Sequence, residues 1–220
     1  MNSERGKFIF SLGVTFLFVL GLTTILVITN REAIMRVRDR AISKAARRGD
    51  LKNLQLLLLT SSSVNGAKGA EMYPLVAAAR AGHNDIVRFL LAAGADINAA
   101  DFSGTPLMAA IAERRIETVK LLLEKGADPK AGSYFGTTAL NMAVQAGQLE
   151  IVKLIIPRVD VKSKATPSPL AIAILQRRMD IVHLLLDNGV KMEDSEKQSM
   201  LEMARRMGNE EIIKALGQLE

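Results

Sequence analysis

The chain contains no cysteine and no tryptophan among its 220 residues. The absence of cysteine excludes disulfide bonds, cysteine-based metal sites and a cysteine nucleophile, although it leaves the redox compartment open. Only two histidines occur, His83 and His183. Neither belongs to a Ser/His/Asp grouping or a set of metal ligands, and the sequence has no glycine-rich phosphate loop. It therefore predicts a protein that is not an enzyme, with no cofactor, no metal and no small-molecule substrate.

Charge is absent from Phe8 to Asn30, a run of 23 residues without Asp, Glu, Lys, Arg or His. As a helix rising about 1.5 Å per residue, Phe8 to Ile28 would extend about 31 Å, close to the hydrocarbon thickness of roughly 30 Å. The competing interpretation is a cleavable signal peptide, but its apolar core is shorter and ends at a small-residue cleavage site that this sequence lacks. We therefore expect an uncleaved transmembrane helix over residues 8–30, after a tail of residues 1–7.

A basic stretch over residues 31–40 follows the apolar run, and we expect it to form a juxtamembrane helix. Anionic lipid headgroups attract such segments, so lipid contact is the first interpretation and a solvated helix face is the second. Nucleic acid is not expected as a partner, because the basic cluster has no interleaved aromatic residues. The residues predicted to contact lipid headgroups are Arg31, Arg36, Arg38 and Arg40.

The same charges bear on orientation. Cytoplasmic flanks carry the excess of Lys and Arg, and this excess lies on the carboxyl side of the span. We therefore expect a single-pass membrane protein whose main domain faces the cytoplasm. The alternative is a bacterial protein whose domain lies in the periplasm, which an amino-terminal anchor flanked by Arg5 and Lys7 also suits.

The rest of the chain repeats itself. Four short motifs align with leucine-to-leucine spacings of 32, 33 and 30 residues, which is typical of stacked supersecondary units. A threonine or serine before proline predicts a capped helix start, and glycine after the second apolar pattern predicts a left-handed residue that ends a helix. The motifs are Tyr73-Pro74-Leu75, Thr105-Pro106-Leu107, Thr138-Ala139-Leu140 and Ser168-Pro169-Leu170.

This pattern resembles the ankyrin repeat family. The resemblance implies an all-α solenoid of helix-turn-helix repeats joined by finger loops, here preceded by the transmembrane helix. The third clear unit departs from the pattern, because Pro157 stands where the closing glycine is expected and should end its helix early. Together with a weaker first repeat and a degenerate last one, the expected repeats cover residues 41–72, 73–104, 105–137, 138–167, 168–199 and 200–220.

In ankyrin proteins the fingers and the inner face of the first helices form the usual binding groove, so the resemblance implies a protein partner of unknown identity. Aromatic residues often dominate binding energy, and four of them fall in or beside the expected fingers. Packing between fingers is the other interpretation of these aromatics. The predicted partner-binding residues are Tyr73, Phe102, Tyr134 and Phe135 in the fingers and Arg80, Glu113, Gln145 and Gln176 on the inner face.

Two functions follow from these expectations. The first is a membrane-anchored scaffold or adaptor that binds a protein partner through the fingers and the concave inner-helix face. The second is a structural or assembly subunit of a larger membrane complex, whose transmembrane helix packs on other helices. Gly13, Leu17, Gly21 and Thr24 lie roughly on one face of that helix and would permit close approach.

Overall fold

The computed structural model describes residues 33–59, 63–66, 72–132, 137–159, 168–189, 194–206 and 208–217. In these ranges all regular structure is helical, apart from an isolated bridge between Asp101 and Gly104. The transmembrane helix expected over residues 8–30 lies outside the described residues, as do the tail of residues 1–7 and Arg31. Among the helices that are described, none has both the length and the apolar character needed to cross a bilayer.

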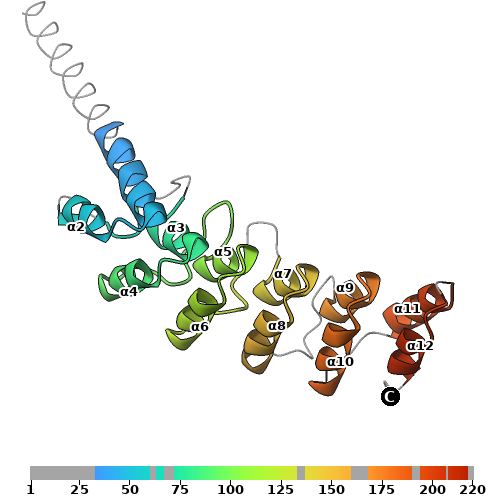
Figure 1. The fold of residues 1–220 in the computed structure, drawn as a ribbon. Coiled ribbons are helices and arrows are strands. Elements are labelled where there is room, and N and C mark those ends of the chain that lie inside the picture. The colour runs from blue at the N-terminus through green and yellow to red at the C-terminus, as the bar shows by residue number, and fades with distance from the viewer. Residues whose placement is uncertain are drawn as a thin grey trace, which may run out of the picture.

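The helices pair in sequence order and stack in a single row (Figure 1). Residues 33–48 form the first helix, and its partner is α2. Each later pair has an inner helix and an outer helix, and each inner helix from α3 to α9 packs on the next inner helix. The pairs are α3 (Pro74–Ala81) with α4 (Asn84–Ala92), α5 (Pro106–Ala112) with α6 (Ile116–Glu124), α7 (Ala139–Gln145) with α8 (Leu149–Ile155), α9 (Pro169–Leu175) with α10 (Met179–Asp187), and α11 (Asp194–Arg206) with α12 (Glu210–Gly217). α2 spans Leu51–Leu59.

The inner helices begin where the sequence predicts. Thr105 Oγ1 accepts a hydrogen bond from the Met108 N–H at 3.3 Å, and Thr138 Oγ1 accepts one from Asn141 at 3.3 Å. Ser168 Oγ does the same for the Ala171 N–H at 3.4 Å. Each bond pairs an amide that the helix itself leaves unpaired, which fixes the first turn. Tyr73 occupies the same position before α3 but provides no side-chain cap.

The core is continuous from the first pair to the last. Small residues on the inner helices let neighbouring helices approach closely, and larger aliphatic residues of the outer helices fill the space between layers. Leu90, Leu122 and Leu185 are fully buried. The alanines expected to keep the inner helices slim, all at 0% exposure, are Ala78, Ala79, Ala110, Ala143 and Ala173.

The helix ends also follow sequence chemistry. Gly94, Gly126 and Gly189 adopt φ values of 88°, 91° and 75°, the left-handed conformation expected after an outer helix. α8 ends at Ile155 and continues as a 3-10 helix, η1 (Ile156–Arg158), as Pro157 predicts.

Two expected boundaries fall inside helices. The helix of residues 33–48 runs without a break across the boundary between the juxtamembrane segment and the first repeat, because no glycine or proline interrupts it. The boundary expected at residue 200 lies inside α11, which begins at Asp194 and has 13 residues. Proline is absent directly before Leu201, and α11 begins ahead of Ser199, which stands where Thr138 and Ser168 cap the inner helices α7 and α9.

Candidate partner-binding site

The finger between α4 and α5 ends in a tight turn at residues 101–104. The Asp101 and Gly104 backbones exchange two hydrogen bonds, at 3.2 and 3.0 Å. The Asp101 carboxylate is 4% exposed. Its Oδ1 accepts bonds from the Ser103 N–H at 2.8 Å and the Ser103 hydroxyl at 2.6 Å, and its Oδ2 accepts one from the Tyr73 N–H at 3.2 Å. One buried side chain thus holds the turn and ties it to the preceding finger.

Phe102 lies within this turn and is 71% exposed. Because both neighbours of Phe102 are held by the Asp101 carboxylate or the bridge, little backbone freedom remains to be lost when a partner covers the ring. Tyr73, by contrast, is half-buried and its N–H is used by Asp101. Tyr134 and Phe135 lie outside the described residues.

A second set of contacts keeps the bases of the fingers in register. The Asp96 N–H donates to Asn65 Oδ1 at 2.8 Å, and the Asp128 N–H donates to Asn98 Oδ1 at 2.9 Å. Asp96 and Asp128 in turn accept bonds from the N–H groups two residues on, at 2.9 Å each. The same asparagine-to-amide bond therefore joins the first three repeats along their loop side.

The inner helices α3, α5, α7 and α9 are buried or half-buried except at their carboxyl-terminal turns. Gln145, Glu113 and Gln176 are exposed, and Arg80 is half-buried. These predicted residues stand five or six residues after the repeat leucine, at the carboxyl-terminal end of each inner helix, and we call them the row. Within the described residues, Arg80 Nε is buried without a hydrogen-bond acceptor.

Leu175 belongs to the same row, although the sequence analysis did not single it out. It stands five residues after Leu170, as Gln145 does after Leu140 and Arg80 after Leu75, and it is 54% exposed. The signal that could have found it is this register, since an apolar residue at a position otherwise polar or small is informative. The row therefore runs from a guanidinium at α3 to an aliphatic side chain at α9.

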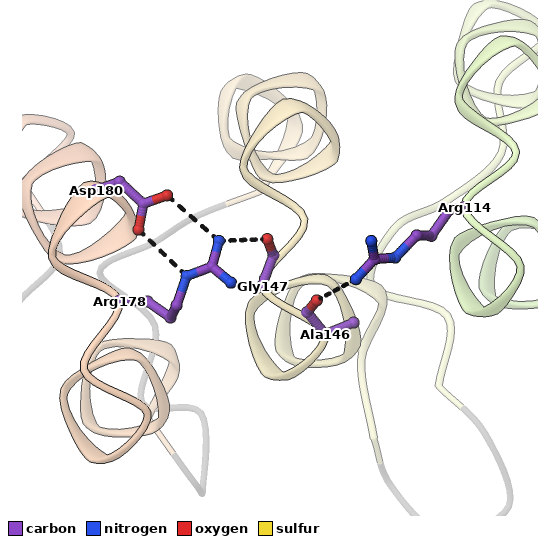
Figure 2. Close-up of polar contacts among 5 residues, drawn as sticks. All are labelled: Arg114, Ala146, Gly147, Arg178 and Asp180. Atoms are coloured by element: carbon purple, nitrogen blue, oxygen red, sulfur yellow. Dashed lines mark hydrogen bonds and ion pairs between the residues drawn. The ribbon is translucent and has the colours of Figure 1, made fainter.

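The turns between inner and outer helices form the opposite edge of the repeats from the fingers. There, one residue in each of the second to fifth repeats reaches back to a carbonyl of the preceding repeat: His83 Nε2 lies 3.1 Å from the Arg47 oxygen, and Arg115 Nε donates to the Arg80 oxygen at 3.3 Å. Gln148 Nε2 donates to the Ile111 oxygen at 2.9 Å. Figure 2 shows Arg178 Nη2 donating to the Gly147 oxygen at 2.7 Å. His83 is thus a structural residue.

The residue before this position adopts a left-handed conformation in all six repeats. Gly49, Gly82, Gly147 and Gly208 stand there in four repeats, and arginine stands there in two, with φ of 54° at Arg114 and 55° at Arg177. Arg114 Nη2 donates to the Ala146 oxygen at 3.2 Å, on the turn that Arg178 also contacts (Figure 2). Two guanidinium groups from opposite sides therefore contact the carboxyl end of α7, where positive charge is favourable.

Two ion pairs near the last repeats have exposed or partly exposed side chains. Arg178 contacts Asp180 at 3.4 Å, and its hydrogen bond to that carboxylate is the main reason why the pKa of Asp180 lies below its ordinary value. His183 lies 3.6 Å from Glu211, and both side chains are more than half exposed. The part of the chain that is described contains no group of three or more His, Cys, Asp or Glu side chains able to hold a metal ion.

The residues predicted to contact lipid are not equivalent. Arg36 and Arg40 are exposed on the helix of residues 33–48. Arg38 is half-buried, and its Nη2 approaches Met35 Sδ, so it lies on another side of the helix. One basic stretch therefore contributes to two different surfaces.

Comparison with known proteins assigns the family. None of the curated proteins gives a significant match to this chain. The family model described as ankyrin repeats (three copies) matches residues 42–133 and 140–219, which is most of the chain and includes every inner helix from α3 to α11. Such repeats are generally interaction modules, not enzymes. The chain belongs to the ankyrin repeat family.

Proposed function

We propose that this protein is a membrane-tethered scaffold that captures a protein partner with the finger at residues 101–104 and the exposed row on its inner helices. Phe102 is the observation that carries the proposal. A large aromatic side chain that is 71% exposed on a turn fixed by a buried carboxylate has the properties of a binding hot spot. Phe102 is not one of the residues that form the buried core of the solenoid.

The row on the inner helices supports the same surface. The half-buried guanidinium of Arg80 offers hydrogen-bond donors at one end of the row, and Leu175 offers exposed apolar area at the other. A partner with a carboxylate near α3 and an apolar side chain near α9 would satisfy both. Between them, Gln145 supplies an amide that can both donate and accept.

The tether is the apolar run of residues 8–30, and the side of the membrane follows from the basic flank. We place the solenoid in the cytoplasm, with the periplasm of a bacterium as the alternative. Protease added to cells whose outer membrane has been permeabilised distinguishes the two placements, because only a periplasmic solenoid would be cleaved. The competing function, an assembly subunit that packs through residues 8–28, rests on residues outside the described part of the chain.

Site-specific photo-crosslinking in native membranes tests the partner surface. A photoreactive residue at position 102, at position 145 or at position 175 should give an adduct with one and the same protein, identified by mass spectrometry. The same probe at Lys153, an exposed position on the outer helix α8, should give none.

The crosslinks also have an outcome that rejects the proposal. Equal adduct yields from all four positions, or adducts with unrelated proteins from positions 102 and 175, would show that this face captures nothing specific. Phe102→Ala should weaken the crosslink from position 175, whereas Lys153→Ala, at an exposed position of the outer helix α8, should leave it unchanged.

A further inference from the structure

In the described residues, one side of the first repeat is exposed. In the helix of residues 33–48, Ile42 and Ala46 are fully buried, whereas Ile34 and Val37 are 66% and 67% exposed. Residues seven and four positions apart share a helix face, so Val37, Lys44 and Arg48 form one outward stripe. Lys44 and Arg48 are exposed as well.

Comparison with the internal repeats shows which side this is. Lys44 occupies the position of Ala77 and Ala109, which are 0% and 1% exposed. Asn53 occupies the position of Ile86, and Ile86 is fully buried against its neighbours. These positions are covered by the preceding repeat in the interior of the solenoid, so Lys44 and Asn53 mark the end face turned away from the second repeat.

Exposed apolar residues are concentrated at this end. The six large hydrophobic residues that are exposed in the described ranges include four in residues 33–59. Leu56 and Leu59 are 65% and 83% exposed, one helical turn apart on α2, and Lys52 lies one turn before Leu56. Exposed apolar residues that lie together with a polar rim are typical of a surface that contacts another partner or a membrane.

Charge is concentrated there too. Residues 33–59 contain seven Lys and Arg but only two Asp, whereas residues 60–220 contain 19 of each sign, so the net charge of +6 lies wholly in residues 1–59. Asp39 is 8% exposed and so lies on the core side of its helix. Asp50 Oδ1 accepts the Asn53 N–H at 3.0 Å as a cap of α2. The outward surface therefore combines cations with aliphatic side chains.

We propose that this end of the solenoid, defined by Ile34, Val37 and Lys44 on the end face and by Arg48, Leu56 and Leu59 beside it, docks on an anionic phospholipid bilayer. The interfacial region of such a bilayer offers negative headgroups above apolar chains, and this matches both properties of the surface. The inference rests on the proposed function, because it names the lipid class that the tethered solenoid contacts. Docking at this surface would hold the partner-binding row in a fixed orientation relative to the membrane.

The absence of cysteine makes the test clean. Leu59→Cys in the full chain gives a single site for an environment-sensitive fluorophore, and Ala92→Cys is the matched control, because residue 92 is the exposed equivalent of residue 59 in the second repeat. Both variants are reconstituted into vesicles of equal parts phosphatidylcholine and phosphatidylglycerol, and into vesicles of phosphatidylcholine alone. Brominated lipids in the same vesicles report contact by quenching.

The expected result is quenching of the label at position 59 in the anionic vesicles, its loss in the zwitterionic vesicles and at high salt, and none at position 92 in either. Lys44→Glu with Arg48→Glu should abolish the quenching, whereas the exposed pair Lys125→Glu with Lys153→Glu should not. Circular dichroism confirms that the variants fold.

Flotation separates failure of this inference from failure of the tether. A chain that floats with both kinds of vesicle while the label at position 59 stays unquenched retains its tether and overturns the docking proposal, as does quenching that is equal at positions 59 and 92. A chain that floats only with anionic vesicles, quenched at position 59, supports docking and rejects the tether. A chain that floats with neither overturns both.

Discussion

The first repeat and the internal repeats consist of the same pair of helices, but the side that is buried in an internal repeat is exposed in the first. In the second repeat, Ala77 and Ile86 are buried beneath the preceding repeat, and in the first repeat the same positions carry Lys44 and Asn53. Toward the second repeat, however, the first repeat resembles the others: His83 contacts the Arg47 carbonyl as Arg178 contacts that of Gly147. A terminal repeat therefore differs from an internal one on a single side, and that side is free to acquire a function.

The largest difference is expected between truncation of a buried residue of an internal repeat and truncation of an exposed residue of the first repeat. Leu122 is fully buried, so Leu122→Ala should lower the free energy of unfolding by about 2–5 kcal/mol through lost burial and a residual cavity. Leu56→Ala, at an exposed position of the first repeat, should change it by no more than about 0.5 kcal/mol. Urea denaturation of each variant measures both values. Equal losses would mean that Leu56 is packed in the core.

Substitutions at the turn between the two helices of a repeat should show that the first repeat contacts the second repeat as internal repeats contact one another. Gly49 and Gly147 both have positive φ, and a Cβ there would collide with His83 or with the Arg178 guanidinium. Ala at either position should cost about 1–2 kcal/mol for the left-handed backbone and more for the displaced contact. Gly94→Ala, with φ of +88° but no atom within 4 Å of a Cβ, should cost only the backbone part. A denaturation midpoint for Gly147→Ala equal to that of Gly94→Ala would show that the contact is easily displaced.

Removing backbone strain at an internal turn should raise the free energy of unfolding, whereas the substitutions above lower it. Arg177 has a φ of 55° in a place where four other repeats have glycine. Arg177→Gly should raise the unfolding free energy by up to about 1 kcal/mol, because relief of the left-handed conformation outweighs the added freedom of the unfolded chain. Arg114→Gly should gain less, since it also removes the bond to the Ala146 carbonyl. Differential scanning calorimetry of the two variants checks the order, and a larger gain for Arg114→Gly would contradict it.

The smallest effect is expected from the Arg178–Asp180 pair. Its hydrogen bond lowers the pKa of Asp180 in the folded state below the ordinary 3.8, so the pair contributes stability above that pH and loses it as the pH falls through the lower folded pKa. Asp180→Asn should therefore destabilise slightly at neutral pH and lose that difference in strong acid. Both side chains are exposed and screened by solvent, so denaturation curves need matched ionic strength.

Much of the fold could be predicted because its signals are local. The cap of Thr105, the left-handed Gly94 and the early end of α8 before Pro157 each depend on one or two residues and their neighbours in sequence. The repeat period then places these local signals in space, since a unit of fixed length can bury its apolar side only against the next one.

The missing parts of the candidate site depend on tertiary contacts. Asp101 is an ordinary loop aspartate in sequence, and only the stacked fingers bring its carboxylate to the Tyr73 amide 28 residues away. Arg177 could not be expected in a left-handed conformation, because arginine has no local reason to adopt it. Leu175 was within reach, since its register is that of Arg80 and Gln145, and so was the cationic end face around Lys44.

The most direct test of the account is amide hydrogen exchange of the full chain in nanodiscs, compared between anionic and zwitterionic lipid. We predict slower exchange over residues 33–59 in anionic lipid only, while residues 105–124 of the internal repeats exchange at the same rate in both. Exchange over residues 33–59 that does not depend on lipid charge, or that changes equally across both segments, would contradict the claim that the first repeat faces the membrane and leaves the internal repeats to the partner.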